Sequence, residues 1–185
     1  MILSKKVKLT GNVYDRILQI LKMAGWYENR HVCISQVEQY YKNQRVPLIG
    51  AAKSFFEEYY GIADSWFIMY DPTPGRTMSP DFHFDLYPSS ILDDVSEHVF
   101  DDSQSNLSQE QRIIDAVAKE ATTHVGEIGY YYPARVWIGE SGNFYIFHEY
   151  DHDQVHVYQT LMEFLEKEFS QCQCDFATVL VLRDA

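Results

Sequence analysis

The chain has 185 residues and a formal net charge of −12 at pH 7. Hydrophobic residues make up 46% and aromatic residues 15%, which excludes a disordered chain and provides for a sizeable core. Three cysteines are too few for a disulfide framework, and no window approaches the roughly 20 apolar residues that span a bilayer. The N-terminal lysines follow the apolar residues, the wrong order for a signal peptide, so we expect a cytoplasmic protein.

The charge is unevenly distributed along the chain. Residues 1–53 carry nine basic and three acidic side chains, whereas residues 54–185 carry six and 24. Between Asp71 and Glu110, nine acidic residues accompany a single basic residue, Arg76. A solvated face that aids solubility and a surface that attracts a basic partner both account for such a segment. Nucleic acid is disfavoured as a direct ligand, because phosphate contacts need a basic surface.

Helical patterns dominate the first third of the chain. Asn12 can cap a first helix whose apolar face ends at Gly25, and Ser35 with Glu38 forms a capping box for a second. A third helix is predicted from Pro47, which suits a first turn. Its wide aromatic face is indicated by apolar residues at helical spacing: Leu48, Ala52, Phe55 and Tyr59. Gly61 can adopt the left-handed conformation that ends a helix. These helices need a partner layer to bury against.

Short strands follow. Residues 65–71 are rich in aromatic and β-branched residues and predict a strand, which a turn at residues 72–75 ends. The next strand is indicated by the alternation of Phe82, Phe84 and Leu86 with polar neighbours. A short helix near residues 91–99 and a loop over residues 101–106 complete this acidic part.

The second half predicts a helix, a hairpin, a helix and a strand. The first helix has a capping box at Ser108 and Gln111 and ends at Gly126, with an apolar stripe of Ile113, Ile114, Val117, Ala118, Ala121 and Val125. A hairpin is predicted from residues 135–138 and 143–147 around a glycine-containing turn. The last helix is expected to start near Asp153, with Leu161, Met162, Leu165 and Phe169 on one face. A C-terminal strand is predicted near residues 176–182.

This order of elements predicts an α+β fold in a single domain over residues 1–185, with helices packed around a largely antiparallel β-sheet. No internal repeat is visible, and no linker divides the chain.

One stretch matches a catalytic motif. His148, Glu149 and His152 fit the zinc metalloprotease pattern H-E-x-x-H, and His156 follows. The pattern works only on a helix, which places both imidazoles on one face beside the metal. Here it directly follows a predicted strand, and we interpret it as a polar turn, so we expect no metal site and no cofactor. Incidental metal binding by the three histidines stays open.

The residues collected above resemble the SUKH superfamily of bacterial immunity proteins, and its third group most closely. The matching pieces are Gly25-Trp26 with Arg30, Pro47, Ala51, Phe55, Tyr60-Gly61, Gly129, Tyr132-Pro133, the stretch 136–145 and the closing helix. The resemblance covers roughly residues 12–169 and rests on the order and spacing of structural motifs. The acidic segment near residues 88–127, read as an insertion, and the C-terminal strand depart from the family pattern.

The resemblance implies an antidote that neutralises a secreted polymorphic toxin, often a nuclease, by direct stoichiometric binding. It implies no enzymatic activity and carries over no catalytic residue. Two alternatives stay open: a small zinc-dependent hydrolase that uses residues 148–152, and a general protein-binding adaptor. We expect the toxin domain to be basic. We expect this chain itself to bind neither nucleic acid nor a membrane. The candidate partner-binding residues are the acidic side chains that flank the predicted loop: Asp93, Asp94, Glu97, Asp101 and Asp102.

Overall fold

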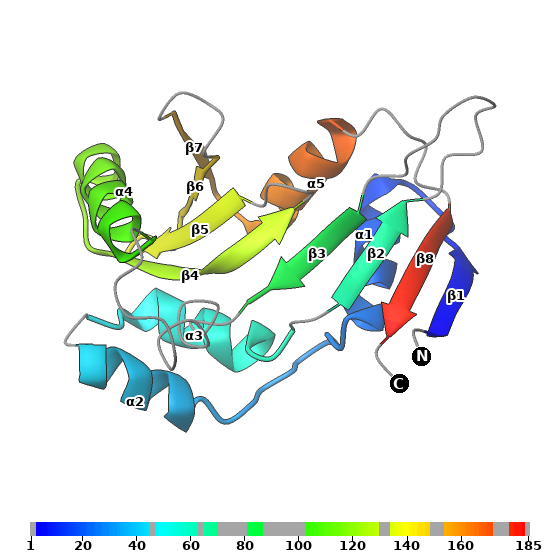
Figure 1. The fold of residues 1–185 in the computed structure, drawn as a ribbon, viewed down its shortest axis with the longest axis horizontal. Helices are drawn as coiled ribbons and strands as arrows, with labels where there is room; N and C mark the ends of the chain where they lie inside the picture. Colours follow the sequence, from blue (N-terminus) through cyan, green and yellow to red (C-terminus); the bar gives the residue numbers. More distant parts are fainter. Residues whose placement is uncertain are drawn as a thin grey trace.

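The structure, a computed structural model, describes residues 3–44, 47–62, 65–69, 81–86, 103–129, 134–148, 154–171 and 178–183. These residues form an α+β fold of five helices and eight strands. The strands make one sheet in the order β1-β8-β2-β3-β4-β5-β6-β7, and every neighbouring pair is antiparallel (Figure 1). The predicted fold class is therefore confirmed.

The helices are α1 (Val13–Met23), α2 (Ser35–Gln44), α3 (Gly50–Tyr59), α4 (Ser103–Ala118) and α5 (Leu161–Gln171). The strands are β1 (Leu3–Lys8), β2 (Ser65–Met69), β3 (Asp81–Asp85), β4 (Thr122–Gly129), β5 (Ala134–Gly139), β6 (Phe144–Phe147), β7 (Val155–Tyr158) and β8 (Thr178–Arg183).

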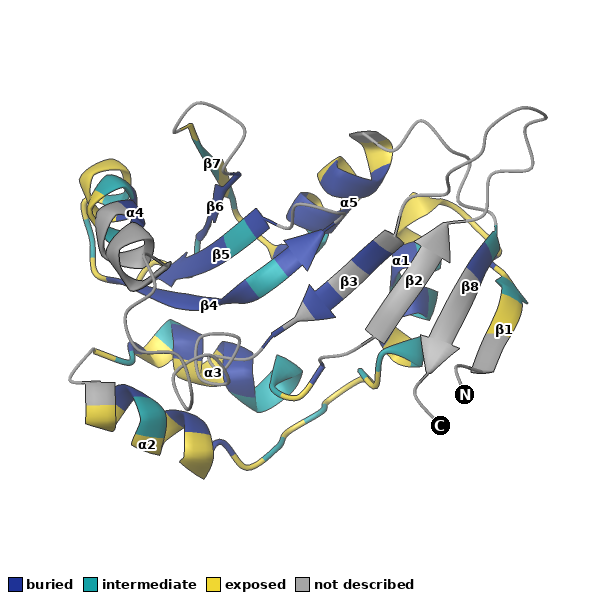
Figure 2. Ribbon diagram, in the orientation of Figure 1, coloured by how far each residue is buried: buried dark blue, intermediate teal, exposed yellow. Residues whose placement is uncertain are grey.

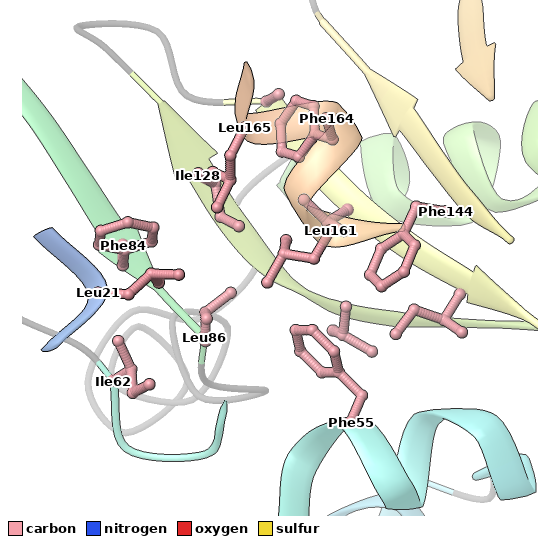
Figure 3. Close-up of a cluster of buried hydrophobic side chains, with 14 of the residues drawn as sticks. Leu21, Phe55, Ile62, Phe84, Leu86, Ile128, Phe144, Leu161, Phe164 and Leu165 are labelled. Atoms are coloured by element: carbon pink, nitrogen blue, oxygen red, sulfur yellow. The ribbon is translucent and has the colours of Figure 1, made fainter. Parts of the chain in front are cut away.

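The sheet is covered on its two faces by different helices. Apolar residues of α1, α2, α3 and α5 form one large cluster with the sheet, part of which Figure 3 shows. The opposite face carries a smaller cluster beneath α4, which comprises Ile114, Trp137, Tyr145 and Phe147. Because side chains alternate along a strand, neighbouring residues such as Val136 and Trp137 serve different clusters. Burying each large apolar side chain contributes about 1.5–3 kcal/mol.

The first helix forms as its sequence predicts. The amide of Asp15 donates to the Asn12 side chain over 2.9 Å, and the Asn12 amide donates back to the Asp15 carboxylate over 3.0 Å. This reciprocal capping satisfies two amides that have no partner within the helix. After the helix, Gly25 adopts a φ of +110°, a conformation that a side chain disfavours.

The second and third helices start differently from the prediction. Ser35 is already the first residue of α2, and Glu38 pairs with Lys53 of α3 over 2.8 Å instead of closing a capping box. Pro47 precedes α3, which begins at Gly50. The carbonyl of Pro47 accepts a hydrogen bond from the Thr123 hydroxyl over 3.2 Å, so the proline anchors the loop to β4.

The prediction of one long helix from a cap at Ser108 up to Gly126 is wrong at both ends. Helix α4 already includes Ser108 in its interior and ends at Ala118, after which Lys119 has a φ of +56°. The residues Ala121, Val125 and Gly126 belong to the turn and to β4. Strand β4 is buried on both faces, as Figure 2 shows, so its sequence has no period-2 alternation to reveal it.

The last helix also starts later than predicted. Residues 155–158 form strand β7, which pairs with β6, and α5 begins only at Leu161. The hydroxyl of Thr160 accepts from the amide of Glu163 over 3.1 Å and so caps the helix. Asp153, the expected start, lies outside the described residues.

The chain ends contribute two neighbouring strands. Strand β1 was not predicted, because Lys5, Lys6 and Lys8 interrupt its apolar pattern. The predicted C-terminal strand is present as β8 and lies inside the sheet, between β1 and β2. Of the segment expected as an insertion near residues 88–127, residues 122–127 belong to the inner strand β4; the division into domain and insertion stays a prediction.

Several predicted features lie outside the described residues. They are the turn at residues 72–75, the short helix near residues 91–99, residues 101 and 102 of the loop expected over residues 101–106, and the residues Tyr132 and Pro133. The rest of that loop prediction is wrong, because residues 103–106 belong to helix α4. Within the described residues, no helix combines the length and the apolar character needed to cross a membrane.

Candidate partner-binding surface

The predicted partner-binding residues lead directly into helix α4. Asp93, Asp94, Glu97, Asp101 and Asp102 all lie outside the described residues, so their positions are not tested. The chain is described again from Ser103, the first residue of α4 and the next residue after Asp102. Helix α4 is therefore the described element that follows the predicted binding residues in the sequence.

An ion-pair cluster anchors α4 to the sheet. The guanidinium of Arg135 on β5 pairs with Glu110 of α4 and, over 3.3 Å, with Glu127 of β4. Burial alone would lower the pKa of Arg135, but the hydrogen bonds and charges of the two carboxylates outweigh it and raise the pKa. Because the Glu110 side chain is only 8% exposed, its charge depends on Arg135 for compensation.

A second polar contact fixes the rotation of α4. The indole N–H of Trp137 donates to the side-chain oxygen of Gln111 over 2.9 Å. The Gln111 amide donates in turn to Thr122 over 2.6 Å and to Asp115 over 2.8 Å, and Thr122 donates to Asp115 over 3.0 Å. Trp137 is fully buried, so this chain of bonds satisfies a donor that would otherwise be unpaired.

The turn between β5 and β6 is tied to the C-terminal end of α4. The carboxylate of Glu120 accepts from the Ser141 amide over 2.7 Å, from the Ser141 hydroxyl over 2.6 Å and from the Tyr145 hydroxyl over 2.6 Å. Desolvation alone would raise the pKa of Glu120, but these hydrogen bonds leave it below its usual value. A Cβ at Gly139 would collide with the same carboxylate, which explains the glycine.

One buried histidine beneath α4 is unused by any of these contacts. His124 on β4 lies edge-on to Trp137, with ring centroids 4.8 Å apart, and neither ring nitrogen has a hydrogen-bond partner in the described part of the chain. Desolvation, followed by the nearby charge of Arg135, lowers the pKa of His124 to about 3. The imidazole is therefore neutral at neutral pH, and its role is packing. Nothing in its sequence context marked it.

The histidines of the zinc motif do not share a helix. His148 directly follows strand β6 and is not helical, and His156 lies in β7, with the two ring centroids 6.3 Å apart. The Nε2 atom of His148 lies 3.2 Å from the carboxylate of Glu168 on α5, and both side chains are buried. Glu149 and His152 lie outside the described residues. The helix that the motif requires is thus absent at His148, and no metal-binding group of three or more acidic, histidine or cysteine side chains occurs in the described part of the chain.

Four of the residues that carried the family resemblance lie at the C-terminal end of α3: Trp26, Arg30, Tyr60 and Gly61. The guanidinium of Arg30 donates to the carbonyls of Glu58 and, over 2.6 Å, of Tyr60 at the C-terminal end of α3, where a helix runs out of intrahelical donors. The Trp26 indole donates to the Glu58 carboxylate over 2.8 Å. Gly61 follows with a φ of +81°. These contacts therefore stabilise the C-terminal end of α3.

Comparisons with known proteins place the chain in a family through one of three searches. Neither a search of curated proteins nor a search of solved structures finds a match. The family model described as SUKH-3 immunity protein matches residues 13–167, from the start of α1 into α5. The match covers most of the sheet and all five helices in whole or part. The chain therefore belongs to the SUKH-3 immunity protein family.

Proposed function

We propose that this protein neutralises a cognate secreted bacterial toxin in the cytoplasm, by direct stoichiometric binding and without catalysis of its own. The observation that most supports the proposal is the SUKH-3 immunity protein match over residues 13–167. An immunity protein acts by occupying its toxin, so it needs a well-anchored surface and no reactive site. Helix α4, with its ion pairs and its buried indole contact, offers such an anchored element.

The charge of the chain favours a basic toxin, and a nuclease in particular. Residues 71–110 carry a net charge of −8, from nine acidic side chains and Arg76. A nuclease needs a basic groove for phosphates, which an acidic segment can occupy by charge complementarity. Such steering raises the association rate by about 10- to 1,000-fold at low salt, and salt screens it.

The first test is protection of cells. The toxin domain encoded by a neighbouring reading frame is expressed with and without this protein, and growth is scored. Rescue together with a purified one-to-one complex supports the proposal. A toxin that kills equally in the presence of stably folded protein contradicts it.

The second test locates the surface. Neutralising Asp93, Asp94 and Glu97, and then also Asp101 and Asp102, to Asn or Gln should lower the association rate with the toxin and flatten its salt dependence. A matched control removes three exposed charges elsewhere: Glu28, Glu140 and Glu166. If both triple variants change the association rate equally, only net charge matters, and the acidic segment is not the contact surface.

A further inference from the structure

The two edges of the sheet differ in their chemistry. Strand β1, at one edge, carries Lys5, Lys6 and Lys8, a common protection of edge strands against pairing with other chains. Strand β7, at the other edge, contains no Asp, Glu, Lys or Arg, and neither do the flanking positions within residues 154–160, in a chain of net charge −12. Within the described residues, β7 therefore lacks the lysines that protect β1.

The hydrogen-bond pattern shows which groups of β7 point outward. The amide of Gly139 donates to the carbonyl of Asn143 over 3.0 Å, so this is a hydrogen-bonded pair of the β5–β6 hairpin. Such pairs alternate along an antiparallel ladder, so Trp137 and Tyr145 form the next one. Phe144 and Ile146 of β6 must then direct their N–H and C=O groups towards β7.

On β7, these groups meet Tyr158 and His156, the register partners of Phe144 and Ile146. The N–H and C=O groups of Val155 and Val157 therefore point away from the sheet. The amide of Gln159, the next outward position, donates to the Glu163 carboxylate over 2.8 Å. Among the described residues, Val155 and Val157 thus each offer a donor and an acceptor to an incoming strand.

Apolar side chains adjoin this open edge. Val157 is 49% exposed on β7, and Val117 is 47% exposed on the neighbouring helix α4. Val155 packs against the cluster beneath α4, so the edge is fixed to the sheet and the helix. An incoming strand would cover Val157 in addition to completing the backbone pairing.

From these observations we propose that β7 pairs with β7 of a second copy of this chain, antiparallel about a two-fold axis at His156. In this register, Val155 of each copy lies opposite Val157 of the other, so both outward donors and both acceptors of each copy are paired. A register with Val157 opposite itself would place Val155 opposite Gln159, whose amide is already bonded to Glu163. Residues 154–160 contain no Asp or Glu, so two strongly acidic chains can pair along this strand without carboxylates facing each other within it.

The mass of the protein in solution tests the proposal. Sedimentation equilibrium from about 1 to about 100 μM should show a monomer–dimer equilibrium. Val157→Lys places charges at the pairing edge and should raise the dissociation constant at least about tenfold. The matched control is Val13→Lys, since Val13 is 39% exposed on α1, far along the chain from β7, and this variant should dimerise normally. A wild-type monomer throughout the range, or an unchanged dimer of Val157→Lys, overturns the proposal.

A cysteine cross-link tests the register and does not depend on how well Val157→Lys folds. In a background with Cys33, Cys172 and Cys174 replaced by Ser, His156→Cys should form an intermolecular disulfide, because opposite residues at the axis are a closely spaced pair. Val13→Cys in the same background should not. A dimer that fails to cross-link at position 156 in the folded protein, or that cross-links equally at position 13, contradicts the proposed pairing.

Discussion

Replacement of Phe55 by Ala tests whether the aromatic face of α3 holds the helix on the sheet. Phe55 is 6% exposed and stacks on Tyr59 with ring centroids 4.8 Å apart. It also meets Phe144 of β6 edge-on at 5.8 Å, so it links helix to sheet (Figure 3).

The expected loss of unfolding free energy follows from these contacts. Removing a buried phenyl ring forfeits about 1.5–3 kcal/mol of transfer free energy, and the remaining cavity brings the total to about 3–5 kcal/mol. Each aromatic pair that is lost adds about 0.5–1.5 kcal/mol to the area term, which favours the upper half of that range.

Equilibrium unfolding in urea, followed by circular dichroism, measures this loss. The midpoint should fall while the slope stays unchanged, because the surface exposed on unfolding is nearly the same. The control is Tyr27→Ala, since Tyr27 is 56% exposed and should change stability by no more than about 0.5 kcal/mol. A loss below about 1 kcal/mol for Phe55→Ala would refute the packing of α3 on β6.

Two further predictions concern the charges beneath α4. Arg135→Met removes the guanidinium that pairs with the buried Glu110 carboxylate and should cost about 3–5 kcal/mol in urea melts. The double variant with Glu110→Leu should recover much of that loss, and no recovery would mean that the pair does not anchor the helix. For His124, the folded-state pKa of about 3 lies below the unfolded value of about 6.5, so the unfolded chain binds the proton first and stability falls as pH drops through this window. His124→Phe should remove the part of the acid-induced loss of unfolding free energy that this histidine causes, about 1.4 kcal/mol per pH unit. The exposed His31, replaced by Phe, serves as the control. An unchanged pH dependence of stability for His124→Phe would contradict the burial of a neutral imidazole.

Local signals in the sequence predicted the elements whose physics is local. The cap at Asn12, the left-handed conformation of Gly61 and the apolar side of the strand at Phe82 and Phe84 each depend on a few neighbouring residues. The cap and the glycine conformation are found as predicted, and both phenylalanines are buried. The hairpin around Gly142, with its φ of +85°, belongs to the same group.

The misassigned elements owe their form to distant contacts. Strand β4 was read as the end of a helix because burial on both faces removes alternation, and β7 is too short to outweigh the helical pattern that follows it. The anchor of α4 is also non-local, since Glu110 and Arg135 lie 25 positions apart. The side chains of the proposed acidic contact surface remain a prediction from composition.

The place of β8 in the sheet has a consequence for synthesis. This strand pairs with β1 on one side and β2 on the other, so Lys8 and Thr178 become neighbours only after all the residues between them have left the ribosome. Until then, the edges of β1 and β2 that pair with β8 have no partner strand. Closing the long loop between β1 and β8 is slow compared with forming the helices and hairpins. The nascent chain is therefore most prone to mispairing at β1 and β2. The lysines of β1 disfavour pairing of this strand with other polypeptides before β8 is available.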